Sequence, residues 1–166
     1  MTIIDTLLAE LEQEAQSTAR VLERVPQEHL SWRPHPKSFS LGQLALHVAT
    51  IPGNVAQLAA MDTVSGPPAF IQQEAATAAE LVPALKASVA QARETLGGLD
   101  DAAMMATWRL NIGGRDVLSM PRAAVARMIM LNHWYHHRGQ LLVYLRMHDV
   151  PLPSVYGPTA DENPFA

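Results

Sequence analysis

The chain has 166 residues, of which 48% are hydrophobic and 17% are charged, a composition typical of one globular domain rather than a disordered chain. A net charge of -4 without any run of Lys or Arg argues against nucleic-acid binding through phosphate contacts, and no segment approaches the roughly 20 apolar residues that span a bilayer. The absence of cysteine excludes disulfides and thiolate metal ligands, and the acidic N-terminus lacks signal-peptide features, so we expect a soluble cytoplasmic protein with one domain over residues 1–166.

Two amphipathic helices are predicted in the first part of the chain. Apolar residues recur every three to four positions over residues 4–25, which is the period of one helical face. Pro26 ends this pattern. After an irregular connection, Ser40 is a suitable N-cap for a second helix over residues 41–58. The pair Pro52-Gly53 interrupts this second helix, so we expect a kink there.

A third helix is predicted after a long connection over residues 62–76. Thr77 and Glu80 have the spacing of a capping box, in which each side chain satisfies a free backbone amide at the helix start. The helix should run to about Leu96 and end at Gly97-Gly98, because glycine favours the end of a helix.

The last third of the chain predicts a hairpin, a fourth helix and a tail. Residues 99–120 contain Gly113-Gly114 between two short mixed runs, which indicates a small hairpin or an extended turn. Pro121 suits the first position of a helix, and this helix should continue to about His148. The tail "VPLPSVYGPTADENPFA" is rich in proline, so we expect it to lie extended over the surface.

Together these elements predict an all-α protein, a four-helix bundle with a small extended insert before the last helix. The connections are longer than an up-down-up-down bundle requires. At least one of them is therefore expected to cross over between parallel helices.

Three of the seven histidines fall within the stretch "NHWYHHRGQL" of the fourth helix. His133 and His137 are four residues apart, which places both rings on one helical face, at a spacing that suits two nitrogen ligands of one metal ion. The same spacing also arises without a metal. His136 is rotated by about 100° per residue from its neighbours and cannot share the face of both, so we expect it either to have a structural role or to support a ligand from outside the coordination sphere.

His47 lies beside the apolar stripe of the second helix, where an isolated imidazole needs a partner. It is either a core histidine bonded to another polar group or the third member of a three-histidine set. Three histidine ligands leave a coordination position open, as in catalytic zinc sites. Trp134 stands where a zinc protease of the H-E-x-x-H type carries its base, and no Glu-x-x-His pair indicates a ferritin-like di-metal site.

The stretches "LSWRPHPKSFSLGQLALHVA" and "NHWYHHRGQLLVYLR" resemble the motifs of the DinB family of metalloenzymes, and the resemblance covers nearly the whole chain. It implies that His47, His133 and His137 bind one divalent metal ion. It also implies an up-down-down-up four-helix bundle, a parallel crossover over residues 62–76, and a homodimer. Related enzymes of the wider superfamily are transferases and isomerases that depend on bacillithiol, mycothiol or glutathione.

The other polar residues of the motif and the tail have two interpretations each. Arg138 either binds a substrate carboxylate or pairs with an acid on a neighbouring helix. Gln140 either orients a histidine by a hydrogen bond or is an ordinary surface residue. Tyr156, Asp161 and Glu162 would supply a further ligand or a proton carrier if the tail folds over the open metal position; otherwise the tail simply packs.

Two functional hypotheses follow. The first is a metal-dependent enzyme that acts on a small molecule, by thiol transfer in the manner of an S-transferase or by hydrolysis. Imidazole suits zinc, nickel, copper and iron, with zinc or nickel expected first, and a low-molecular-weight thiol would be the cosubstrate. The second is a non-catalytic bundle stabilised by its metal. We also expect a homodimer packed through helix faces, because apolar residues surround much of the last helix and Gly139 permits close approach of another helix.

Overall fold

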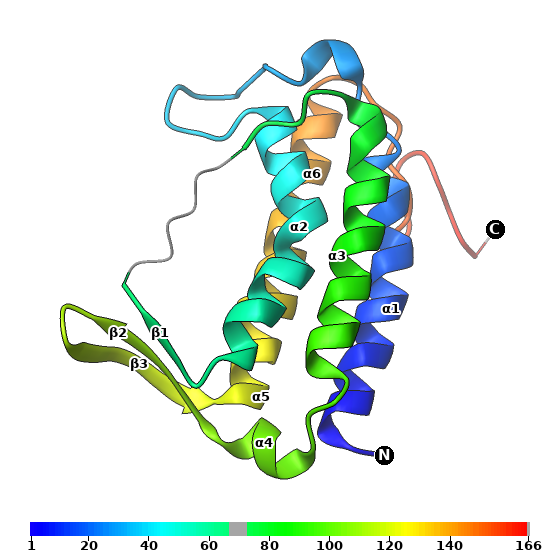
Figure 1. Cartoon of the computed structure of the whole chain (residues 1–166). Coiled ribbons are helices and arrows are strands. Elements are labelled where there is room, and N and C mark those ends of the chain that lie inside the picture. The colour runs from blue at the N-terminus through cyan, green and yellow to red at the C-terminus, as the bar shows by residue number, and fades with distance from the viewer. Residues whose placement is uncertain (67–72, 166) are drawn as a thin grey trace.

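A computed structural model describes residues 1–66 and 73–165. Long helical segments run side by side: α1 points toward the top of the view, α2 and α3 both run toward the bottom, and the last segment returns to the top (Figure 1). Their bounds are α1 (Ile3–Leu22), α2 (Leu41–Ala60), α3 (Leu81–Leu96) and, in the last segment, α5 (Arg122–Val125), the π-helical η3 (Ala126–Asn132) and α6 (His133–Arg146). Within the described residues, no helix has both the length and the apolar character needed to cross a bilayer.

The predicted all-α class is wrong in one respect. The described residues are mostly helical, but they also contain a small three-stranded sheet. The strands are β1 (Thr63–Ser65), β2 (Thr107–Ile112) and β3 (Arg115–Pro121), in the order β1-β2-β3. The predicted hairpin is β2 and β3, which pair antiparallel around Gly113 and Gly114 at φ values of 60° and 80°. β1 pairs parallel with β2. It was missed because residues 62–76 were predicted to be a connection without regular structure. Residues 67–72 of this connection are outside the described part.

The remaining short elements are η1 (Gln27–His29), η2 (Ala78–Glu80) and α4 (Asp101–Met105). The predicted capping box at Thr77 is wrong, since the Thr77 side chain makes no capping hydrogen bond. The Glu80 carboxylate instead accepts a hydrogen bond from the Ala76 amide at 2.9 Å. The single turn η2 therefore precedes α3, which begins at Leu81.

The helix that carries His47 is fixed at its start by Ser40, as predicted. The Ser40 hydroxyl accepts a hydrogen bond from the Gln43 amide, and the Gln43 side chain accepts one from the Ser40 amide, at 3.1 Å and 3.0 Å. These two bonds satisfy amides that an uncapped helix leaves free. His47 then follows on the second turn of α2.

Pro52 does not divide α2, which continues through it to Ala60. Proline has no N–H to donate to the carbonyl four residues earlier, and the Val48 carbonyl accepts a hydrogen bond from the Trp134 indole N–H at 2.8 Å. The amide of Gly53 donates to the Ser88 hydroxyl of α3 at 2.7 Å. At the predicted interruption α2 is therefore continuous, and its backbone is hydrogen-bonded to side chains of α6 and α3.

The predicted fourth helix is one continuous segment with a change of winding. The π-helical turns of η3 contain more residues per turn than an α-helix, so they shift the phase of everything that follows. After this shift, Trp134, Arg138, Leu141 and Leu145 form the buried face of α6. His133 and His137 each precede a member of this face by one residue, which places them at its margin.

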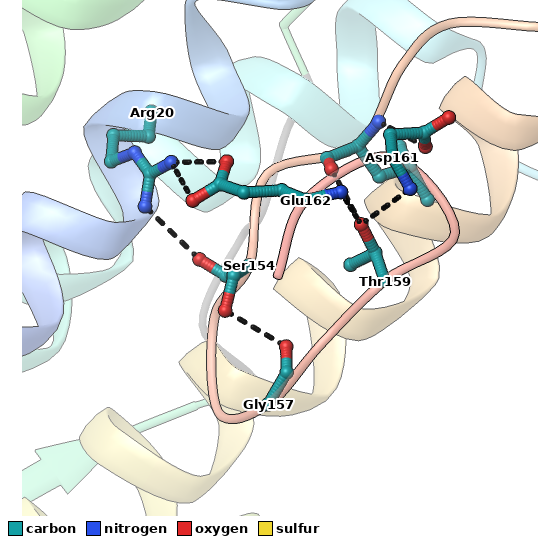
Figure 2. A network of polar contacts seen from close by, with 7 residues as sticks. Arg20, Ser154, Gly157, Thr159, Asp161 and Glu162 are labelled. Carbon is teal, nitrogen blue, oxygen red and sulfur yellow. Dashed lines mark hydrogen bonds and ion pairs between the residues drawn. The ribbon is translucent and has the colours of Figure 1, made fainter. Parts of the chain in front are cut away.

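The tail after α6 is held against α1 rather than lying loosely over the surface (Figure 2). The Arg20 guanidinium donates to the Glu162 carboxylate at 2.6 and 2.5 Å and to the Ser154 carbonyl at 3.2 Å. The Thr159 hydroxyl accepts hydrogen bonds from the amides of Asp161 and Glu162. Tail residues far apart in sequence from α1 are thereby fixed in place.

Candidate metal centre

Three histidines from two helices gather at one place between α2 and α6. One ring nitrogen from each of His47, His133 and His137 lies within 4.8 Å of the corresponding atoms of the other two. The ring centroids are 5.3 Å apart for His47 and His133, 4.6 Å for His47 and His137, and 4.5 Å for His133 and His137. All three side chains are partly buried. We call these residues the histidine cluster.

Hydrogen bonds fix the orientation of the two rings on α6. The Nδ1 atom of His137 lies 2.7 Å from the Gln140 amide oxygen, which can only accept a hydrogen bond. The His133 ring is bonded to the backbone of Ile129, and its Nε2 lies 2.8 Å from the Nε2 of His137. The His137 ring therefore uses Nδ1 as a donor to Gln140 and directs Nε2 toward the ring of His133.

With the proton of neutral His137 on Nδ1, its Nε2 presents a lone pair to the Nε2 of His133. Without a metal, a proton on the His133 Nε2 makes this 2.8 Å contact an N–H···N hydrogen bond; a divalent ion in place of that proton would be bound by both lone pairs. Two nitrogens bound to one tetrahedral zinc ion are about 3.4 Å apart, so a small outward movement of the rings suffices. The donor set of three imidazoles thus fits a divalent ion such as zinc.

Burial keeps the histidine cluster neutral. It lowers the pKa of His47 to about 4, with smaller contributions from the charges that His137 and His133 would carry. Burial also lowers the pKa of His133 and of His137. Near neutral pH the imidazoles are therefore in the form that binds metals.

His136 lies on a different side of α6, as predicted. Its side chain is exposed, and its ring centroid is 5.0 Å from that of His137, but its nitrogens do not belong to the group that could share an ion. Trp134, which separates His133 from Tyr135, is fully buried and packs in the core. Neighbours in sequence thus have different environments because helical rotation separates them.

Arg138 and Tyr156 lie in a separate polar cluster with Glu14. The Arg138 guanidinium is 2.6 Å from the Glu14 carboxylate, and Arg138 is only 2% exposed. The Tyr156 hydroxyl lies 2.5 Å from Arg138 and donates to Glu14 at 2.9 Å. Arg138 thus forms the ion pair with a neighbouring helix, the structural of the two interpretations, and Tyr156 hydrogen-bonds both members of this pair from the tail.

The two acidic residues of the tail that were considered as ligands, Asp161 and Glu162, pair with arginines instead of contacting the histidine cluster. Asp161 is bonded to Arg146, and Glu162 is bonded to Arg20. Among the described residues, no hydrogen bond or ion pair joins Asp161 or Glu162 to a histidine of the cluster, so these contacts do not support a tail folded over the metal position. Gln140 alone of the predicted supporting residues is hydrogen-bonded to a histidine of the cluster.

Two features beside the cluster were not predicted. The first is Phe39, whose ring centroid lies 5.9 Å from that of His47 and 6.5 Å from that of His137. An aromatic residue directly before an N-cap is usually interpreted as a hydrophobic staple for its own helix, so the sequence contains no separate signal for this role.

The second feature is a cavity of about 130 Å³ that His47 and His133 share with apolar side chains of α2, β1, β2 and the α5–η3 segment. Val64, Trp108 and Leu110 of the sheet form part of its wall, and Asn54 is the remaining polar side chain. The cavity depends on the missed strand β1, so it could not be predicted. We call it the apolar cavity.

Comparisons with known proteins agree with this fold. The sequence profile of the DinB superfamily matches residues 10–141. The uncharacterized protein YrdA of Bacillus subtilis (strain 168) is 25% identical over 166 residues, covering 96% of this chain and 91% of YrdA. A DinB-like protein from Bacillus cereus ATCC 10987 superimposes with a TM-score of 0.71 at 23% identity, covering 92% of this chain and 97% of that one; for the DinB-like protein YjoA of Bacillus subtilis the values are 0.69, 21%, 90% and 96%. As its two histidine motifs predict, the chain belongs to the DinB superfamily.

Proposed function

We propose that His47, His133 and His137 bind one divalent metal ion, zinc or nickel, and that the protein is a metal-dependent enzyme acting on a small molecule. The observation that supports this most directly is the convergence of one ring nitrogen from each histidine within 4.8 Å of the others, with the Nε2 atoms of His133 and His137 2.8 Å apart and the His137 Nδ1 bonded to Gln140. We further propose that residues 1–166 form one domain of the up-down-down-up four-helix type, with the sheet as an addition to it.

Each residue of the site has a definite task in this proposal. The three imidazoles hold the ion, while Gln140 keeps the His137 ring in the tautomer that offers Nε2. Phe39 and the walls of the apolar cavity exclude water from part of the site. When bound, the ion supplies a Lewis acid with a coordination position that the protein leaves open, as in catalytic zinc sites.

The reaction that we propose is thiol transfer to an electrophile or hydrolysis. The chain contains no cysteine, so a thiol would come from a low-molecular-weight cosubstrate. A non-catalytic role, in which the ion only stabilises the bundle, is the alternative. Assays of the zinc-loaded protein with a panel of small thiols and electrophiles separate the two: turnover supports the enzyme, and stabilisation by zinc without turnover supports the alternative.

Chelator competition tests the ligand set. Replacing His47 by Ala should weaken zinc binding by more than about 100-fold, because loss of a mere supporting hydrogen bond already costs about 10–100-fold. His136→Ala is the matched control, since His136 is exposed and outside the histidine cluster. It should change the affinity less than about threefold, by the small effect typical of exposed positions. Equal losses in the two variants would overturn the assignment.

We also propose a homodimer that packs through the outward face of the last helical segment. Val143 and Met147 are 60% and 56% exposed there. Among the described residues, and apart from its chain neighbours and the backbone of its own helix, no atom lies within 4 Å of a Cβ added at Gly139, so no other described helix makes the close approach predicted at this glycine. A second copy is the partner that we propose for this face.

A further inference from the structure

The apolar cavity is more than a gap in the packing. Protein interiors are close-packed and contain few voids larger than a water molecule, yet this cavity of about 130 Å³ adjoins two of the three proposed metal ligands, His47 and His133. Its remaining walls come from three regions of the sequence, which are α2 with the adjacent β1, then β2, then α5–η3. A space at the junction of so many elements, and directly beside the histidine cluster, has the position of a binding site.

The chemistry of the walls selects an uncharged apolar occupant. Among the lining residues there is no Lys, Arg, Asp or Glu to pair with a charge. The indole N–H of Trp108 already donates to the Leu58 carbonyl at 2.9 Å, so this ring offers carbon atoms to the cavity. A charged group would lose its hydration here without compensation, and water needs two to four polar partners to remain.

The volume limits the size of this occupant. A cavity of about 150 Å³ lined by apolar side chains holds one benzene molecule, and the present cavity of about 130 Å³ is slightly smaller. It therefore accepts a group of about six heavy atoms, such as a short alkyl chain or a small ring. Larger tails, and the charged peptide-like tails of many cellular thiols, do not fit this chamber.

We propose that the apolar cavity binds a small uncharged alkyl or aryl group of the substrate, while the reacting end of the same molecule lies at the histidine cluster. This inference rests on the proposed metal site for the second half of its content. The first half, the occupancy of the cavity by an apolar group, stands on the walls and the volume alone.

The cavity is tested first without metal, with benzene as the probe. Ligand-observed NMR on the full chain in the presence of a chelator should show binding to the wild type. Leu110→Trp places a large side chain in the wall and should abolish binding. Ile112→Trp is the matched control, because Ile112 lies on the same strand, is 39% exposed and does not line the cavity. Absence of benzene binding, or equal binding to Leu110→Trp, would overturn the proposal.

The link to the metal is tested next with zinc-loaded protein and the series ethanethiol, 1-propanethiol and 1-butanethiol. The thiol group is the same throughout, so only the buried chain changes. Calorimetry should show affinity rising about fourfold for each added methylene, the gain expected for burial of a CH₂ group. The rise should persist in Ile112→Trp and disappear in Leu110→Trp; a flat series in the wild type contradicts the proposal.

Two failures remain distinguishable by these measurements. If zinc does not bind to the wild type, the proposed function fails, and the benzene experiment still decides whether the cavity binds apolar groups. If zinc binds to all three proteins but benzene binds to none, the cavity proposal fails and the metal site stands. Should Leu110→Trp not fold, as judged by circular dichroism, Val64→Phe fills the same cavity from the paired position on β1.

Discussion

His47 experiences two effects that both disfavour its charged form. Its ring is removed from much of the surrounding water, and two other imidazoles face it, so a proton on any one ring raises the cost of a proton on the next. From the sequence alone, His47 had two interpretations: a core histidine or a third metal ligand. The structure brings its ring to His133 and His137, an arrangement in which neutrality of all three rings serves metal binding.

The stability of the metal-free protein should therefore fall in mild acid. The pKa of His47 is about 4 when folded and about 6.5 when unfolded, so the unfolded state takes up the proton first. The contribution of His47 to the free energy of unfolding is fully present above pH about 6.5 and is lost as the pH falls toward 4, by at most about 3 kcal/mol. Burial lowers the pKa of His133 and His137 as well, which adds to the same trend.

Urea denaturation in the presence of a chelator between pH 7.5 and 4.5 (the pH range over which these groups titrate) measures this loss. The variant His47→Gln has no titrating ring at this position, so its unfolding free energy should depend less steeply on pH than that of the wild type. Parallel curves for the two proteins would show that His47 does not have the depressed pKa.

At the scale of elements, α2 and α3 approach each other closely at Gly53. A Cβ at this position would lie 2.4 Å from the Gln91 side-chain oxygen and 3.0 Å from the Ser88 backbone carbonyl. The Gln91 side chain can rotate away, but the carbonyl belongs to the helix and cannot. The same segment of α2 carries the bond from Gly53 to Ser88, so the helix that bears His47 is positioned partly by this contact.

Gly53→Ala should consequently destabilise the protein by about 1–3 kcal/mol, the usual range for overpacking. Gly98→Ala is the control: Gly98 is exposed and has no neighbour within 4 Å of an added Cβ, so its effect should stay within about 0.5 kcal/mol. The midpoints of chemical denaturation measure both. Equal stability of the two variants would show that the helices separate at no cost.

Local signals explain which elements were predictable. Ser40 and the glycines after Leu96 act on their own helix ends, and both predicted boundaries are confirmed. Thr77 showed the same kind of pattern, yet the Glu80 carboxylate bonds to a different nearby amide. β1 is stabilised by pairing with β2, which is far away in the sequence. The three residues of β1 are too few to show the alternation of apolar and polar residues that identifies a strand. The π-helical turns of η3 equally lack a sequence period that distinguishes them from α-helix.

At the scale of the whole molecule, helical spacing predicted that His133 and His137 share a face, but not that His47 joins them. Their convergence requires α2 to lie against α6, which the family motifs implied and local pattern could not. Neither the family motifs nor the local sequence pattern predicted the apolar cavity, because its walls combine two helical segments with a sheet. Enclosed spaces are properties of packing among distant segments, and they appear only when all of the segments are placed.

The proposed homodimer makes a prediction at the same scale. Light scattering at micromolar concentration should give twice the chain mass of 18.1 kDa for the wild type. Val143→Lys should give the mass of one chain, because a buried unpaired ammonium is costly. Met105→Lys, at a position 57% exposed on α4, should remain dimeric. A wild type of 18.1 kDa rejects the dimer.

The bond between Trp134 and the Val48 carbonyl joins residues that are 86 positions apart, and this separation bears on when the site can exist. Closing so long a loop is entropically costly, and contacts of this kind form slowly compared with helices. During synthesis, a chain that has not yet reached residue 133 contains only one histidine of the cluster. The complete three-histidine group therefore forms only when α6 docks on α2, after the other long helices have been synthesised.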